Sequence, residues 1–204
     1  MSFLTQEETP MQVTETIESP NGRKVVIFKM MNEEPNPRLG MENRTTMFLL
    51  HRKYTMGDSH TFETAEALEE FALSMHDVVL APVFMHELNG EIDLRIDPFR
   101  DEANSGMVGF CYITREEVES EFGEWTDESR ELALLTLEEE LDRYTAWLND
   151  DIYGYNLYDE KGTVIDQNVG YHGADHESSG LYDDAGVEVD AFGRLGLVGF
   201  VQES

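Results

Sequence analysis

The sequence predicts an α+β fold: a single domain of mainly antiparallel sheet with about three helices. Short segments rich in β-branched and aromatic residues recur along the chain, which is the pattern of strands. Two of them are joined by Asn89 and Gly90, a dipeptide that strongly indicates a hairpin. Only a few segments have apolar residues at helical spacing. The expected helices therefore interrupt runs of strands and do not alternate with single strands, which is the order typical of an α+β fold.

The N-terminal quarter is expected to hold a leader and two strands. Residues 1–22 are rich in Thr, Glu, Ser and Pro and end at a Ser-Pro-Asn-Gly turn signal, so we expect a mobile acidic leader. The string RKVVIFKMM at 23–31 predicts the first strand. Two prolines force a loop at 32–40, and the string TTMFLLHRKY predicts a second strand at 45–54.

A helix and a hairpin follow. Residues 61–76 place apolar side chains at helical spacing, with glutamates elsewhere on the wheel, which predicts an amphipathic helix. The apolar string at 78–86 predicts a buried strand, and the Asn-Gly turn pairs it with a strand at 91–96. The apolar positions of the helix are Ala65, Leu68, Phe71, Ala72 and Met75.

The remaining elements are a strand, two helices and a second hairpin. The string MVGFCYI at 107–113 predicts another buried strand. Thr114 followed by Glu117 has the spacing of a capping box and predicts a short helix. The longest helix is expected at 127–149. The two strands of the last hairpin are expected at 152–158 and 163–169.

These elements define three regions of the chain. The leader covers residues 1–22, the α+β domain 23–173, and a Gly- and Asp-rich extension 174–204, which is expected to dock in part through the apolar residues 195–201. Cys111 is the only cysteine, which excludes an internal disulfide and favours a reducing cytoplasm. No apolar run approaches the roughly 18 residues of a membrane span, and the first residues lack the pattern of a signal peptide.

The most informative property of the chain is its charge. Forty-three Asp and Glu against 14 Lys and Arg give a formal net charge of -29 over 204 residues. The excess lies in the C-terminal half, because residues 101–204 carry -21 of it. Such a surface repels nucleic acid and anionic membranes and attracts proteins with basic grooves. We therefore expect a basic protein as partner, and neither direct nucleic-acid binding nor membrane binding.

The expected helix at 127–149 separates apolar and acidic residues onto opposite sides. Leucines and a tyrosine fall on one stripe of the wheel, and five carboxylates fall within an arc of about 100° on the opposite side. At 1.5 Å rise per residue the carboxylates span about 21 Å, so they could stand in for a row of phosphates. An ordinary solvated helix face has the same appearance. The stripe is Leu134, Leu137, Leu141, Tyr144 and Leu148, and the candidate partner-binding residues are Glu128, Glu131, Glu138, Glu139 and Asp142.

Candidates for enzyme chemistry are weaker. His172 and His176 would offer a pair of metal ligands if they were helical, but glycines precede both and no third ligand is placed by spacing. Cys111 lies in an apolar strand, where a cysteine acts as a small hydrophobe. The segment from His51 to Lys53 is the only basic cluster, and we expect it to form ion pairs with the acidic body. We therefore expect no catalytic residues, no metal and no cofactor, and a protein that is not an enzyme.

Four strings resemble a family of small accessory proteins from tailed viruses of prokaryotes, a family without an established activity. The likeness covers residues 25–173 and is carried by NPRLGMENRTTMFLLHRKYTMGD, IDPFRDEANSGMVGFCYITREEV, LDRYTAWLNDDIYGYNL and VIDQNVGYHG. It does not extend to the leader or to the extension after Ala174, and it transfers no site residue. It implies a protein carried by a virus or another mobile element and supports a single domain, and we expect this protein to stay in the cytoplasm of the host cell.

By charge and viral context alone, the chain is also similar to antirestriction and anti-CRISPR proteins that mimic DNA. The leading hypothesis is a non-enzymatic inhibitor whose acidic surface occupies a nucleic-acid-binding groove of a host defence or DNA-handling protein. A first alternative is a metal-dependent enzyme or factor centred on His172–His176. A second is a viral accessory protein whose acidity is haloadaptation, since the chain has only four Lys against ten Arg.

Overall fold

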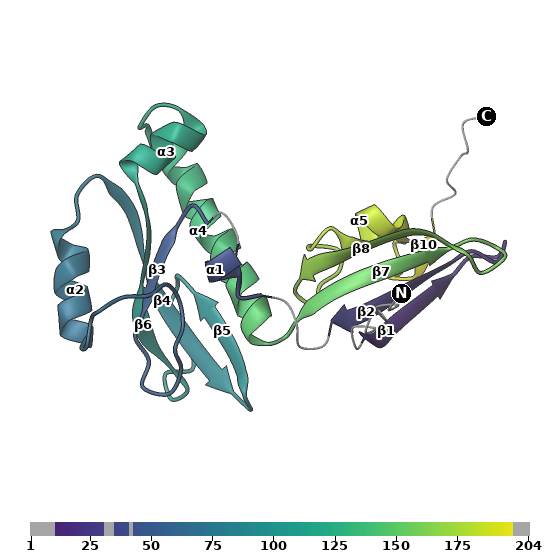
Figure 1. Ribbon diagram of the computed structural model, residues 1–204, viewed down its shortest axis with the longest axis horizontal. Helices are drawn as coiled ribbons and strands as arrows, with labels where there is room; N and C mark the ends of the chain where they lie inside the picture. Colours follow the sequence, from purple (N-terminus) through teal and green to yellow (C-terminus); the bar gives the residue numbers. More distant parts are fainter. Residues whose placement is uncertain (1–10, 31–34, 41–42, 198–204) are drawn as a thin grey trace, which may run out of the picture. The chain divides into compact units, whose positions relative to one another are not determined.

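The computed structural model describes residues 11–30, 35–40 and 43–197 and has a mixed α+β fold with mainly antiparallel sheets (Figure 1), which confirms the predicted fold class. Within the described residues there are five helices, not about three. Two of them escaped the sequence analysis, α1 (Pro37–Gly40) and α5 (Leu181–Ala185). Helices of four and five residues complete barely one turn, so no helical periodicity reveals them.

The chain divides into two compact units, which are described separately. The central unit comprises residues 35–149, and the flanking unit comprises the residues on either side, up to 34 and from 150 onward. The predicted boundaries after residues 22 and 173 do not coincide with this division and stay a prediction.

The central unit contains a four-stranded antiparallel sheet in the order β3-β6-β4-β5. The predicted hairpin between β4 and β5 is confirmed, and Asn89 and Gly90 turn it with positive φ angles of 56° and 92°, which Asn and Gly adopt most readily. Strand β3 ends at Leu49 and not at residue 54, because the chain then turns back on the strand: Gly57 bridges to Phe48, and the Asp58 N–H donates to the Met47 carbonyl at 2.7 Å. The strands are β3 (Thr46–Leu49), β4 (Val78–Leu88), β5 (Glu91–Arg95) and β6 (Ser105–Thr114).

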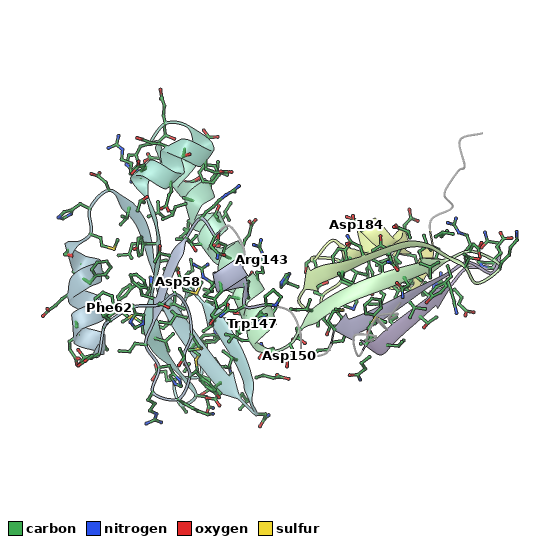
Figure 2. The ribbon with its side chains drawn as sticks, in the orientation of Figure 1. Asp58, Phe62, Arg143, Trp147, Asp150 and Asp184 are labelled. Atoms are coloured by element: carbon green, nitrogen blue, oxygen red, sulfur yellow. The ribbon has the colours of Figure 1, made fainter. Side chains whose placement is uncertain are left out.

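Helices cover both faces of this sheet, α2 (Ala65–Ser74) on one side and α4 (Asp127–Leu148) on the other (Figure 1). On the α2 side, rings from the sheet, from α2 and from the loop before it pack with centroids 5.1–6.5 Å apart. Phe62, in that loop, is marked in Figure 2. These rings belong to Phe48, Phe62, Phe71 and Tyr112.

The α4 side of the sheet holds the main core of the central unit. Leu137, Leu141 and Tyr144 are buried there against sheet residues that include Met47, Val83 and Cys111, while the other two stripe residues are half-buried against the same core. Burial raises the pKa of the Cys111 thiol to about 12, so the cysteine stays neutral, as expected of a small hydrophobe. The two half-buried residues are Leu134 and Leu148.

Two capping boxes set the start of the helices that follow β6. Thr114 caps α3 (Arg115–Phe122) and exchanges hydrogen bonds with Glu117, which confirms the predicted box. Thr126 caps α4 in the same way through Ser129. Each box satisfies backbone N–H groups that a helix start leaves without partners.

The flanking unit contains a second antiparallel sheet, in the order β1-β2-β7-β8, and a small β9–β10 hairpin. Its strand β1 forms within the segment that the sequence predicts as a mobile leader. The signal was weak because β1 is an edge strand of mostly polar, exposed residues and buries only Ile17. The strands are β1 (Met11–Glu18), β2 (Lys24–Met30), β7 (Ile152–Tyr158), β8 (Val164–His172), β9 (Val187–Val189) and β10 (Leu195–Leu197).

One face of the second sheet is covered by α5 and by the β9–β10 hairpin. Of the apolar segment predicted to dock at 195–201, residues 195–197 form β10, and residues 198–201 lie outside the described residues, as do residues 1–10 of the leader. The buried side chains of this face are Ile17, Val25, Ile27, Tyr153, Tyr155, Leu157, Tyr171, Leu181, Ala185 and Val187.

Hydrogen bonds from tyrosine hydroxyls connect α5 to the strands of this sheet. Tyr171 donates to the carboxylate of Asp184 on α5 at 2.5 Å (Figure 2), and Tyr182 donates to Glu15 on β1 at 3.1 Å. Burial and the neighbouring carboxylates raise the pKa of both hydroxyls to about 12. The hydroxyls therefore keep their protons at neutral pH and remain hydrogen-bond donors.

The position of Leu141 in the main core leads to a stability prediction. Leu141→Ala is expected to lower the free energy of unfolding by about 2–5 kcal/mol, because it removes buried methyl groups and leaves a cavity. Leu135→Ala, the same change on the exposed side of α4, is expected to change it by less than about 0.5 kcal/mol. Urea denaturation followed by circular dichroism measures both. Equal losses for the two variants would contradict the assigned faces of α4.

Candidate functional site

The candidate site is the solvent-facing side of α4, and buried contacts on the opposite side fix how that helix is rotated. The Tyr144 hydroxyl accepts a hydrogen bond from the Gly57 backbone N–H at 2.9 Å. Asn149, which caps the helix, accepts from the Ile92 N–H at 2.9 Å and donates to the Ile92 carbonyl at 2.7 Å. These bonds join both the loop after β3 and strand β5 to the C-terminal half of α4.

A buried ionic network adds a third connection. The Arg38 guanidinium, whose side chain is only 2% exposed, donates to Glu140 of α4 at 2.8 Å. It also binds Asp58 through two nitrogens, at 3.1 and 2.7 Å, and the Thr45 carbonyl at 2.6 Å. The Arg38 side chain therefore binds groups that lie 7, 20 and 102 residues away in sequence.

The two carboxylates of this network are fully engaged. Glu140 also accepts from the Thr45 hydroxyl at 2.6 Å and from the Arg44 N–H at 2.8 Å. Asp58, beside β3 (Figure 2), accepts from the Met47 N–H at 2.7 Å. Buried charges are tolerated when they are paired and hydrogen-bonded in this way. Glu140 was not singled out from the sequence: the helical wheel places it outside the acidic arc and beside the leucine stripe, but the partner that makes its burial possible is 102 residues away.

The five candidate carboxylates project from the other side of α4. Glu128, Glu131, Glu139 and Asp142 are exposed, and Glu138 is half-buried. Among the described residues none of the five has an ion-pair partner within 4.0 Å. Side chains three and four residues apart on a helix lie about 5–6 Å from each other. The exposed side of α4 is therefore a row of carboxylates without ion-pair partners among the described residues.

Two leucines interrupt this row. Leu132 is 43% exposed and Leu135 is 53% exposed, and at about 100° per residue both fall within or beside the arc of the carboxylates. Leu135 has Glu131 four residues before it and Glu139 four residues after it. The sequence analysis did not report these leucines, although their place on the helical wheel was a signal that could have revealed them. The exposed side of α4 is thus acidic at its ends and apolar at its centre.

At the C-terminal end of the row, one carboxyl group has a raised pKa. The Asp142 carboxyl lies in a depression of about 230 Å³, which Arg95, Asp97 and Glu138 also line. Local burial raises the pKa of Asp142, and the neighbouring charges of Glu138 and Asp93 raise it further. Arg95, which lines the same depression, lowers the pKa, so Asp142 lies among charges of both signs.

Helix α3 contributes further acidic residues, but some of them are paired. Glu119 accepts from Arg115 at 2.7 Å, and Glu121 lies 2.8 Å from Arg44. Glu117 is used in the capping box of α3. Two of the four glutamates of α3 are therefore in ion pairs, whereas within the described part of the chain none of the five candidate carboxylates of α4 is.

The residues of the metal-site alternative lie in the flanking unit. His172 is part of β8, paired with Ile152 of β7. His176 lies in the loop after β8, with its ring centroid 4.6 Å from that of Tyr153 and 5.6 Å from that of Tyr182. Within the described ranges, no group of three or more His, Cys, Asp or Glu side chains is placed to hold a metal ion. The contacts that the His176 ring does make are edge-to-face contacts with the rings of Tyr153 and Tyr182.

The basic cluster has the structural surroundings expected of it. Lys53 pairs with Glu87 at 2.5 Å and lies 4.6 Å from the centre of the Tyr54 ring. The Tyr54 hydroxyl donates to the same carboxylate at 2.8 Å, and the His51 ring stacks on Tyr54 with centroids 5.2 Å apart. These contacts join the loop after β3 to strand β4.

Comparison with known proteins gives no family assignment: no family model, no curated protein and no solved structure matches the chain. None of the helices formed by the described residues is both long enough and apolar enough to cross a membrane.

The buried network makes α4 sensitive to a single substitution. Arg38→Met is expected to lower the free energy of unfolding by about 3–5 kcal/mol, because it leaves Glu140 and Asp58 charged without their partner. The matched control is Arg130→Met, which removes an exposed pair with Asp127 on α4 and should cost no more than about 1 kcal/mol. Urea denaturation measures both. Similar losses for the two variants would show that the network does not hold the helix.

The half-buried ring of His176 leads to a prediction about the pH dependence of stability. Burial lowers the pKa of His176 below its usual 6.5, despite the nearby Glu15 and Asp175. As the pH falls from 6.5 toward the lower pKa of the folded state, His176 becomes protonated in the unfolded chain but stays neutral in the folded one. The free energy of unfolding therefore decreases as the pH falls through this range. Comparing His176→Phe with wild type by urea denaturation at pH 7.5 and 5.5 tests this. The wild type should lose more stability than the variant, and equal losses would contradict the lowered pKa.

Proposed function

We propose that the protein is a non-enzymatic inhibitor that uses the acidic side of α4 to occupy the nucleic-acid-binding groove of a basic host protein. The observation that carries the proposal is the concentration of uncompensated charge. Residues 115–149 contain twelve Asp or Glu against three Arg, and the five candidate carboxylates of α4 have no ion-pair partner among the described residues. The resemblance to accessory proteins of tailed viruses points to host defence and DNA-handling proteins as targets.

The dimensions of the row support this function. Glu128 and Asp142 are fourteen residues apart, which corresponds to about 21 Å along the helix axis. Duplex DNA carries one charge per about 1.7 Å of axis, so the row is sparser than DNA but extends over about half a turn of it. Lysine and arginine side chains that neutralise phosphates can reach carboxylates spaced 5–6 Å apart.

The rigidity of the row also supports it. The side of α4 opposite the carboxylates is fixed by the core and by the Arg38 network. A rigid array of charges loses little conformational entropy when it binds, so more of the electrostatic attraction remains as affinity. The net charge of -29 would in addition steer a basic partner toward the protein and speed association.

Haloadaptation is the second candidate, favoured by the small number of lysines, four against ten arginines. Under that function the charge would hold water and cations at the surface, and removing carboxylates from any exposed helix would have a similar effect. The two functions therefore make different predictions. Binding depends on which helix carries the carboxylates, whereas haloadaptation depends only on their number. Helix α2 offers the comparison, because it lies on the opposite side of the same sheet and is also acidic.

The experiment compares two variants that each lose four negative charges from the central unit. The test variant carries Glu131→Gln, Glu138→Gln, Glu139→Gln and Asp142→Asn. The control carries Glu63→Gln, Glu66→Gln, Glu69→Gln and Glu70→Gln, at and before α2. Host proteins captured by the wild type and released by added duplex DNA are purified, and their affinity for each variant is measured from 50 to 300 mM salt. Circular dichroism checks the fold of both variants.

We expect the test variant to bind the captured protein about tenfold more weakly, mainly through slower association, with a flatter dependence on salt. The control should retain most of the affinity, and the wild type alone should not shift labelled duplex DNA at low salt, where repulsion is least screened. Equal weakening by the two variants would contradict an interface on α4. A change only in the salt needed for folding, in both variants alike, would favour haloadaptation.

A further inference from the structure

The geometry points to a basic amphipathic helix as the element of the partner that docks on α4, with Leu132 and Leu135 as the apolar centre of the contact. This inference rests on the proposed function and specifies its partner. The sequence pattern of negative charge alone would suit any cationic surface. The two exposed leucines restrict the fit to a surface that also presents apolar side chains between its positive charges.

The leucines form a pair and are not scattered surface residues. They are three residues apart on α4 and are therefore neighbours on the helix surface, with exposures of 43% and 53%. Carboxylates lie one helical turn away on both sides: Glu128 and Glu131 before the pair, and Glu138 and Glu139 after it. Apolar centres with charged rims are the usual anatomy of protein interfaces.

Charge decides what can cover this pair. A second copy of the chain would bring two rows of carboxylates together, and an anionic membrane or a nucleic acid would meet the same repulsion. At the C-terminal end of the row, Asp142 and Glu138 line one depression with Asp97 and a single cation, Arg95, so a further negative charge would meet mainly carboxylates there. The occupant must therefore carry Lys or Arg on both sides of an apolar stripe.

The spacing favours a helix as the form of that occupant. Helices pack on one another by fitting side-chain ridges of three- and four-residue spacing into grooves, and Leu132 and Leu135 present one such step. The row from Glu128 to Asp142 is about 21 Å long, the length of a helix of fourteen residues. Basic helices of this length are also what many DNA-binding proteins place in the major groove, so covering one would block DNA binding.

Two synthetic 18-residue peptides of identical composition serve as probes. In the first, leucines form one helical stripe flanked by lysines. In the second, the same residues are permuted so that no stripe forms. The proteins are wild type, the double variant Leu132→Gln and Leu135→Gln, the single variant Leu73→Gln, and the four-carboxylate variant of α4. Leu73 is the matched control, since it is 76% exposed on α2. Affinity and dissociation rates are measured by surface plasmon resonance at 150 mM salt.

We expect wild type and Leu73→Gln to bind the striped peptide at least tenfold more tightly than the permuted one. The double leucine variant should bind both peptides equally, because faster dissociation removes its preference while its salt dependence stays that of wild type. Equal binding of the two peptides by wild type would overturn the helix inference but leave the proposed function intact. A four-carboxylate variant that bound both peptides as wild type does would overturn the proposed function itself.

Discussion

The Arg38 guanidinium is the contact on which the arrangement of the central unit depends. It joins α1, the loop after β3 and α4 through Asp58 and Glu140, and it reaches the Thr45 backbone as well. A planar cation with five donors suits this role, because a lysine could not meet two carboxylates and a carbonyl with fixed geometry. In a chain with 43 acidic residues, the network also selects one glutamate of α4 for burial and leaves its neighbours facing solvent.

The burial of Glu140 and the exposure of Glu139 follow from the same geometry. Successive residues on a helix point about 100° apart, so a helix whose Glu140 must reach Arg38 turns Glu139 and Asp142 away from the core. Leu137, Leu141 and Tyr144 then face the sheet, and Leu132 and Leu135 face outward. The apolar centre and the acidic ends of the candidate site are thus consequences of how the opposite side of α4 is held.

Prediction from sequence succeeded where a short pattern determines the local backbone. The Asn89-Gly90 hairpin and the Thr114 capping box are of this kind, since their turn and cap chemistry allows few alternatives. Prediction failed where the deciding contact is distant in sequence. Glu140 is recognisable only once Arg38, 102 residues away, is beside it. Strand β1 was missed for a different reason: its partner β2 follows after a short turn, but most of its residues are exposed and only Ile17 is buried, so the apolar signal for a strand is weak.

The physical distinction between a binding surface and a merely soluble one lies in the leucines of α4. A surface selected only for solubility, or for life in concentrated salt, has no reason to keep two neighbouring leucines exposed on the longest of its acidic helices, because each exposed apolar group works against solubility. A surface selected for binding requires both kinds of residue. Its carboxylates govern how fast a basic partner arrives, and its apolar centre governs how long the partner stays. The exposure of Leu132 and Leu135 among Glu131, Glu138 and Glu139 therefore favours binding over haloadaptation, which the net charge alone could not do.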